Sequence, residues 1–115
     1  MNSDVQKVGE DAAAALLREE GWTVLHRNWS LRLGELDIVA RRGDCLAFVE
    51  VKARQAPAYV DPAFGVDWRK QRKLRRVAEA YLALEKPVFR ECRFDVIGVV
   101  VGEAGVEVTR LTAAF

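Results

Sequence analysis

The spacing of hydrophobic and polar residues divides the chain into helical and extended segments. From Asp4 to Glu20 the apolar side chains recur every three or four residues, as on one face of a helix. Residues 67–85 repeat with the same period, and Asp67 is placed to cap that second helix. The remaining apolar segments are rich in β-branched and aromatic residues and predict strands: 22–27, 35–41, 45–53, 90–101 and 106–111.

The predicted order α-β-β-β-α-β-β indicates an α/β fold in one domain of 115 residues. Strand 45–53, the second helix and strand 90–101 are long enough for a parallel crossover, whereas the first three strands follow one another closely. We therefore predict a mixed β-sheet flanked by helices. Residues 28–33 are expected to connect two strands. Residues 55–66, which include Tyr59 and Phe64, are expected to form a loop that flanks a functional site.

The stretch Gly34–Arg54 places four ionisable side chains among apolar residues. Glu35 and Asp37 share one face of their strand, and Glu50 and Lys52 share one face of theirs, because side chains alternate along a strand. Charges in such apolar strands are costly unless they are paired or bind a metal. The stretch is therefore a candidate active site.

The turn between these strands decides whether the four groups meet. A two-residue turn at Arg42-Gly43 would place Glu35 opposite Glu50, and a four-residue loop would place Asp37 opposite Glu50. Both registers bring all four groups to one face, whereas a three-residue loop would split them. An even-length turn is therefore a requirement of the active-site hypothesis.

Carboxylates beside a lysine suit a hard divalent cation such as Mg²⁺ or Mn²⁺, because Mg²⁺ prefers oxygen ligands and typically binds one or two protein carboxylates. Asp37 and Glu50 would be the ligands, with the main-chain carbonyl of Val51 as a third. Glu35 would be a ligand, an outer partner or a solvated carboxylate. Lys52 would orient or deprotonate the attacking water, or stabilise charge on a phosphate.

The two helices add further candidates. Glu10 lies at the edge of the apolar face of the first helix, where it would serve a second metal or remain a solvated carboxylate. Ser3 and Gln6 have the spacing of a capping box at the start of this helix. In the second helix, Gln71 or Lys70 would meet the scissile phosphate. Six of the eight residues from position 69 to 76 are basic, so we expect flanking phosphates to be held by Arg54, Lys70, Arg72, Lys73, Arg75 and Arg76.

Composition narrows the function classes. The net charge is +1, so affinity for nucleic acid must come from local clustering of charge. The two cysteines form no zinc motif and are expected to be reduced thiols. Neither a membrane-length apolar run nor a signal-peptide pattern is present, so we expect a cytoplasmic protein without membrane partners.

Asp37 followed by Glu50-Val51-Lys52 resembles the PD-(D/E)xK nuclease superfamily, although Leu36 stands where a proline is usual. Nearly the whole chain resembles one bacterial family, the small endonuclease-like YraN-type proteins. The residues that carry this resemblance are Gly9-Glu10, Arg27-Asn28-Trp29, Gly34-Glu35-Leu36-Asp37, Phe48-Val49-Glu50-Val51-Lys52 with Arg54, Phe64-Gly65, Lys70-Gln71-Arg72, Arg93-Phe94-Asp95 and Ala114-Phe115.

The resemblance implies a restriction-endonuclease-like fold, similar to that of Holliday-junction resolvases. It also implies a metal-dependent endonuclease that acts on DNA, with branched, repair or recombination intermediates as candidate substrates. Resolvases of similar fold work as dimers, so a homodimer is one alternative.

Two other functions stay open from the sequence. The first is a nucleic-acid-binding module that keeps the nuclease fold without cutting, and the second is a structural ion network. The presence of Asp37, Glu50 and Lys52 together favours the enzyme. A requirement for Mg²⁺ or Mn²⁺ distinguishes it from the ion network.

Overall fold

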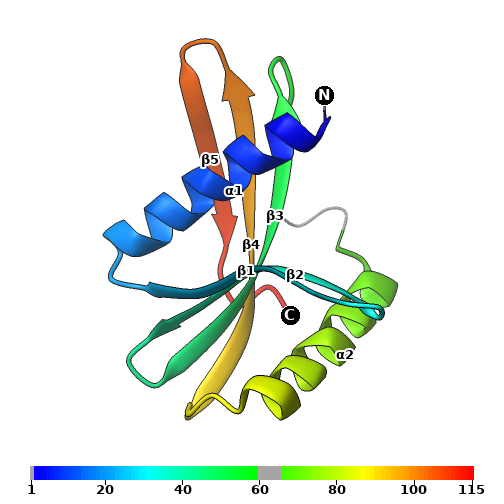
Figure 1. The fold of residues 1–115 in the computed structure, drawn as a ribbon. Coiled ribbons are helices and arrows are strands. Elements are labelled where there is room, and N and C mark those ends of the chain that lie inside the picture. Colours follow the sequence, from blue (N-terminus) through cyan, green and yellow to red (C-terminus); the bar gives the residue numbers. More distant parts are fainter. Residues whose placement is uncertain (1, 60–65) are drawn as a thin grey trace.

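Two helices and five strands make up the computed structural model, which describes residues 2–59 and 66–115 (Figure 1). The elements are α1 (Asn2–Glu19), β1 (Thr23–Leu31), β2 (Gly34–Arg42), β3 (Cys45–Gln55), α2 (Trp68–Glu85), β4 (Glu91–Gly102) and β5 (Gly105–Leu111). The predicted order of helices and strands is confirmed. Phe64 and Gly65 of the expected loop lie outside the described residues.

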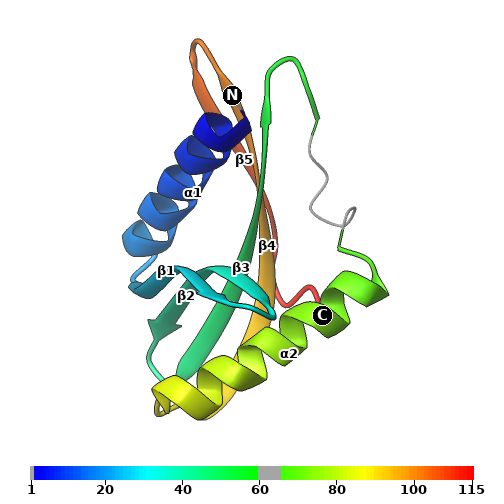
Figure 2. The ribbon, with the colours of Figure 1, turned by 45° about the vertical axis from the view of Figure 1, so that its right-hand side comes forward.

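The strands form one sheet in the order β1-β2-β3-β4-β5. Neighbouring strands are antiparallel except β3 and β4, which run parallel from Cys45↔Glu91 to Gln55↔Val101. The predicted mixed sheet with a parallel crossover is therefore confirmed. Figure 2 shows α1 and α2 on opposite sides of this sheet, the arrangement expected of an endonuclease-like fold.

Each helix covers its own apolar core. Leu17 of α1 packs with Val49 and Ile97 on one face of the sheet, and Tyr81 of α2 packs with Phe48 on the other. Because β3 and β4 are buried on both faces, their sequences are nearly continuous apolar runs. A site at the sheet can therefore receive side chains from α1 on one face and from α2 on the other.

Helix α1 lies unusually close to β3 at Gly9. A Cβ atom added at this position would lie 2.5 Å from the Cβ of Ala53. Real Cβ atoms do not approach one another so closely, so the close contact depends on glycine. This approach brings the next residue, Glu10, against the sheet.

Two local predictions differ from the structure. Residues 28–33 are not merely a connection, because β1 continues to Leu31 and pairs with β2 as far as Leu31↔Gly34. Asn28 takes a positive φ of 50° inside this strand, which asparagine tolerates better than most residues. The capping box is also wrong, since α1 begins at Asn2 and Ser3 lies inside the helix. The Asp67 cap of α2 is confirmed by its side-chain contacts with the N–H groups of Arg69 and Lys70.

The β2–β3 turn has the even length that the active-site hypothesis requires. Arg42 pairs with Cys45, so the turn consists of Gly43 and Asp44, and Gly43 adopts a φ of 59°. The turn lies one residue later than the predicted Arg42-Gly43. The pairing of β2 with β3 follows the register predicted for a four-residue loop, in which Asp37 would face Glu50, although the turn itself has only two residues.

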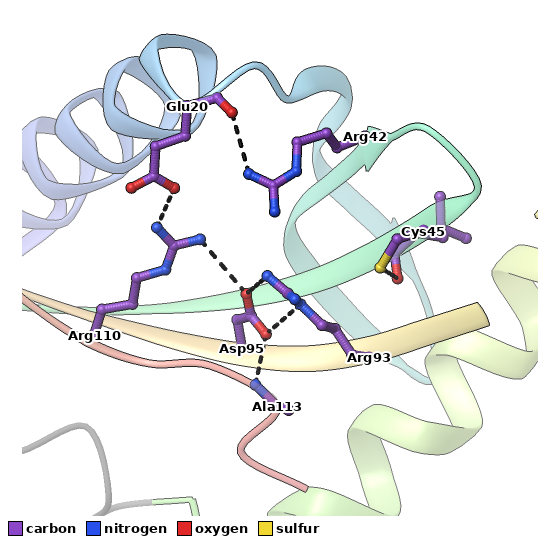
Figure 3. A network of polar contacts seen from close by, with 8 residues as sticks. Glu20, Arg42, Cys45, Arg93, Asp95, Arg110 and Ala113 are labelled. Carbon is purple, nitrogen blue, oxygen red and sulfur yellow. Dashed lines mark hydrogen bonds and ion pairs between the residues drawn. The ribbon is translucent and has the colours of Figure 1, made fainter.

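An ion network centred on the buried Asp95 joins the end of α1 to the C-terminal end of the chain (Figure 3). Asp95 of β4 is fully buried and accepts hydrogen bonds from Arg93, at 3.2 Å, and from the backbone N–H of Ala113, at 2.9 Å. Arg110 of β5 contacts both Asp95, at 3.8 Å, and Glu20 at the end of α1. These contacts satisfy the buried carboxylate and have a structural role.

Within residues 2–59 and 66–115, neither α1 nor α2 is both long and apolar enough to cross a membrane.

Candidate metal centre and nucleic-acid interface

The candidate site lies where β2 separates from β3. The pairing of these strands ends at Ile38↔Val49, while β2 stays paired with β1 as far as Gly34. At this fork the carboxylate of Asp37 accepts a hydrogen bond from the backbone N–H of Val51, with Oδ2 and N 2.8 Å apart. The Asp37 side chain thereby satisfies the buried N–H group of Val51, which has no backbone partner in β2 beyond the end of the pairing. The fork leaves room for side chains from both strands and from α1.

Three carboxylates converge at the fork. Glu10 of α1 and Glu35 and Asp37 of β2 each offer one oxygen, and these oxygens lie within 4.8 Å of one another. Glu10 is only 5% exposed, so the solvated-carboxylate alternative for this residue is wrong. Gly9 explains the burial, because it lets α1 approach β3 closely enough for Glu10 to reach the strand face.

Polar side chains that the sequence analysis gave no role at the site orient these carboxylates. Asn28 donates to Glu10 at 3.0 Å and to Glu35 at 3.4 Å, so its amide bridges the two acids. Gln6 donates to Glu10 at 2.9 Å and to the carbonyl of Val51 at 3.0 Å. Ser30 donates to Glu35 at 3.0 Å. Each acid therefore has a defined orientation before any ligand arrives.

A signal for some of these residues exists in the sequence. Gln6 precedes Glu10 by one helical turn, so the two side chains lie on the same face. Ser30 lies opposite Glu35, which becomes visible only once the β1–β2 pairing is known. Asn28 belongs to the Arg27-Asn28-Trp29 segment of the family resemblance, but its bridging position depends on its positive φ.

The electrostatics of the site favour a cation. Burial, a hydrogen bond to the Glu50 carboxyl and the negative charges of Glu50 and Glu10 raise the pKa of Asp37 to about 9, against the opposing effect of the Val51 N–H. Arg27 lies 4.0 Å from Glu10 and contacts Asp11 more closely, at 2.8 Å. A divalent cation would replace the proton on Asp37, and the all-oxygen donor set fits Mg²⁺ or Mn²⁺.

Glu50 and Lys52 occupy the α2 side of the same fork. The carboxyl groups of Asp37 and Glu50 share a hydrogen bond, as in the register predicted for a four-residue loop; the register predicted for a two-residue turn, with Glu35 opposite Glu50, is not the one found. Glu50 is also 3.7 Å from the Nζ of Lys70 in α2. Lys52 lies two residues beyond Glu50 on the same face of β3 and is half-buried.

An open cleft of about 570 Å³ extends from the carboxylates to the start of α2. Its lining comprises Glu35, Asp37, Glu50, Asp67, Arg69, Lys70, Lys73, Leu74 and Val77. Acidic side chains from the strands thus share one cleft with basic side chains from the helix. This arrangement can hold a cation and a phosphate side by side.

The other predicted phosphate contacts are more dispersed. Arg72 and Arg76 line a second groove beside Trp68, while Arg75 lies over the rings of Phe94 and Phe115. The guanidinium of Arg54 donates to the carbonyl of Ala53 in its own strand, at 2.8 Å. The amide of Gln71 donates to the carbonyl of Val66, at 3.0 Å, and its role toward a phosphate stays a prediction.

The model of the uncharacterised protein family UPF0102 matches residues 9–99, which include the carboxylate cluster, Glu50, Lys52 and the basic start of α2. The chain belongs to the UPF0102 family. This membership confirms the resemblance to YraN-type proteins that the sequence indicated.

Relatives in the UPF0102 family come from several organisms. The chain is 44% identical to a UPF0102 protein of Moorella thermoacetica over 108 residues, which cover 90% of each chain. It is 46% identical to one from Streptomyces griseus over 104 residues, or 90% of this chain and 87% of the relative. A protein of Dictyoglomus thermophilum is 38% identical over 104 residues, or 90% of this chain and 88% of the relative.

Proposed function

We propose that the chain is a metal-dependent endonuclease that hydrolyses phosphodiester bonds in DNA in the cytoplasm. The observation that carries this proposal is the convergence of Glu10, Glu35 and Asp37, whose oxygens lie within 4.8 Å of one another. Two of these acids, Glu35 and Asp37, line a cleft whose other wall is basic. Acids that hold a cation and bases that hold a phosphate are the two requirements of metal-assisted phosphodiester hydrolysis.

The residues that would hold Mg²⁺ or Mn²⁺ are Asp37, Glu50 and Glu10, with Glu35 and the carbonyl of Val51 as additional donors. When bound, such a cation supplies positive charge to the scissile phosphate and makes water a better nucleophile at neutral pH. Gln6 and Asn28 hold Glu10 in place through hydrogen bonds of 2.9 and 3.0 Å, so part of the ligand set is already oriented.

The basic residues of the chain would position the DNA. Arg69, Lys70 and Lys73 line the cleft, where their charges attract the phosphates on either side of the scissile bond. Lys52, on the face of β3 that carries Glu50, would orient the attacking water or stabilise negative charge on the phosphate. These contacts are to the backbone of DNA and give no sequence preference.

The test is cleavage of branched, single-stranded and duplex DNA in Mg²⁺, Mn²⁺ or EDTA. We expect cleavage only with a cation, and loss of cleavage in the Asp37→Asn and Lys52→Ala variants with DNA affinity largely retained. Asp44→Asn, which changes an exposed carboxylate in the β2–β3 turn, and Lys7→Ala, which changes an exposed lysine of α1, are the matched controls.

Cleavage that persists in EDTA or in the Asp37→Asn variant would contradict the proposal. DNA binding without cleavage in either metal would favour the non-cutting nucleic-acid-binding module. Neither cleavage nor binding, with no stabilisation by Mn²⁺, would favour a structural ion network. The mass of the protein in solution, measured with and without branched DNA, tests the homodimer.

A further inference from the structure

Trp68, the first residue of α2, presents a large aromatic ring at the surface. It is 59% exposed, whereas Trp22 is only 3% exposed. The guanidinium carbons of Arg69 and Arg72 lie 5.3 and 5.7 Å from the centre of the Trp68 ring. With these two cations over its ring, the residue remains more than half exposed. The N-cap at Asp67 fixes the backbone from which Trp68 projects.

The groove around this ring is basic and apolar. Its volume is about 440 Å³, and its lining comprises Leu33, Trp68, Arg69, Arg72, Lys73 and Arg76. Arg69 and Lys73 also line the cleft beside the carboxylate cluster. The groove and the cleft are therefore adjacent. An occupant of the groove that suits this lining has a flat apolar part for the indole and negative charge for the arginines.

We infer that this groove binds an unpaired nucleotide of the DNA, with its base stacked on Trp68 and its phosphates held by Arg72 and Arg76. Bases inside a duplex are stacked on one another and cannot reach an aromatic ring on a protein surface, whereas an unpaired base can. A fully paired duplex would contact only the basic side chains. The inference rests on the proposed function, because it names DNA with a single-stranded segment beside the scissile bond as the substrate class.

Binding is measured in EDTA with the Asp37→Asn chain, so that cleavage does not interfere. The probes are a short fluorescent single strand and a blunt duplex of the same length, compared by fluorescence anisotropy. In this background, Trp68→Ala is expected to weaken binding of the single strand about ten-fold, the effect typical of losing one stacked base. Binding of the duplex should weaken by less than about two-fold, because its bases do not reach the ring. Trp68→Phe should retain most of the single-strand affinity.

A spectroscopic signature separates stacking from a general loss of affinity. A single strand that carries one 2-aminopurine should change its fluorescence when it binds the Asp37→Asn chain. The double variant Asp37→Asn with Trp68→Ala, at a concentration that saturates the strand, should not cause this change. Leu84→Ala is the matched control, because Leu84 is 63% exposed near the opposite end of the same helix. Circular dichroism of each variant shows whether the fold is retained, and Trp68→Leu, which keeps an apolar side chain without a ring, takes the place of Trp68→Ala if that variant does not fold.

An equal loss of affinity for single strand and duplex, or an unchanged 2-aminopurine signal on removal of the ring, would overturn the inference. The proposed function can fail separately. A wild-type chain that cuts nothing in Mg²⁺ or Mn²⁺ while the Trp68-dependent signal is present would remove the nuclease activity and keep the binding site. If the Trp68→Ala chain cuts and binds DNA as well as the wild type does, the stacking site is refuted and the nuclease proposal stands.

Discussion

A methyl group at position 9 is expected to displace helix α1 and to take Glu10 out of the carboxylate cluster. The added Cβ would lie 2.5 Å from the Cβ of Ala53, a buried residue of β3. Non-bonded carbon atoms prefer a separation of about 3.5 Å or more. Since neither methyl group can rotate away, the helix must move by roughly 1 Å. Glu10, the next residue, moves with it.

The energetic consequence has two opposing parts. Overpacking of this kind costs about 1–3 kcal/mol, while alanine in place of a helical glycine contributes about 1 kcal/mol of stability. The net change from Gly9→Ala is therefore small or moderate and does not test the packing by itself. A double-mutant cycle with Ala53→Gly does, because it removes the opposing methyl group.

In the Ala53→Gly background, Gly9→Ala should stabilise the protein by about 1 kcal/mol, the helix-propensity gain alone. The expected coupling between the two positions is therefore about 1–3 kcal/mol. Urea unfolding of the four chains in EDTA, followed by circular dichroism, measures it. A coupling below about 0.5 kcal/mol would refute the close approach of helix and strand.

Mn²⁺ binding by calorimetry tests the link from this packing to the site. Gly9→Ala should weaken binding, because Glu10 is displaced from the other carboxylates, and Ala53→Gly should restore it in the double variant. Weak binding in Gly9→Ala that the second substitution leaves unchanged would show that Glu10 does not depend on this contact.

Three further predictions follow from charges described above. Folding raises the pKa of Asp37 from 3.8 to about 9, so in EDTA the wild type should lose stability relative to Asp37→Asn as the pH rises from about 4 to about 9. The free energy of unfolding of Asp37→Asn minus that of the wild type should be near zero at pH 4 and on the order of 2–4 kcal/mol at pH 7. If urea unfolding shows the same value of this difference at every pH, the burial of this acid is contradicted. Asp95→Asn should lower the free energy of unfolding by about 3 kcal/mol, because it leaves two arginines without their buried carboxylate; an unchanged urea midpoint would refute this role. In titrations of single-stranded DNA against salt, Arg72→Gln should reduce the slope of log affinity by about one, whereas Lys7→Gln, which changes an exposed lysine of α1, should leave it nearly unchanged; equal slopes for the two variants would contradict the distinction.

Much of the fold was predictable because local patterns and tertiary packing agree. The helical period of α2 and its Asp67 cap, the apolar runs of β3 and β4 and the parallel crossover between them all appear in the structure as expected. The requirement for an even-length turn was also sound, because side-chain alternation makes register decisive for the two acidic strands.

The features missed at the site depend on departures from regular structure. Asn28 adopts a positive φ without ending β1, so its segment reads as a connection although the strand continues. The helical period placed Glu10 at the edge of the apolar face, but its nearly complete burial depends on the contact of Gly9 with Ala53, residues 44 positions apart that a helical period cannot relate. The fork at Asp37 is the end of a strand pairing, which has no signature of its own in the sequence.

The position of the fork has a consequence for how this protein can change. Glu10 and Gln6 reach the site from one side of the sheet, and the cleft opens toward α2 on the other. Under the proposed function, substitutions in α1 would therefore alter which metal is preferred, while substitutions in α2 would alter which DNA is held. Lys70 links the two properties, because its Nζ in α2 lies 3.7 Å from Glu50, one of the proposed metal ligands.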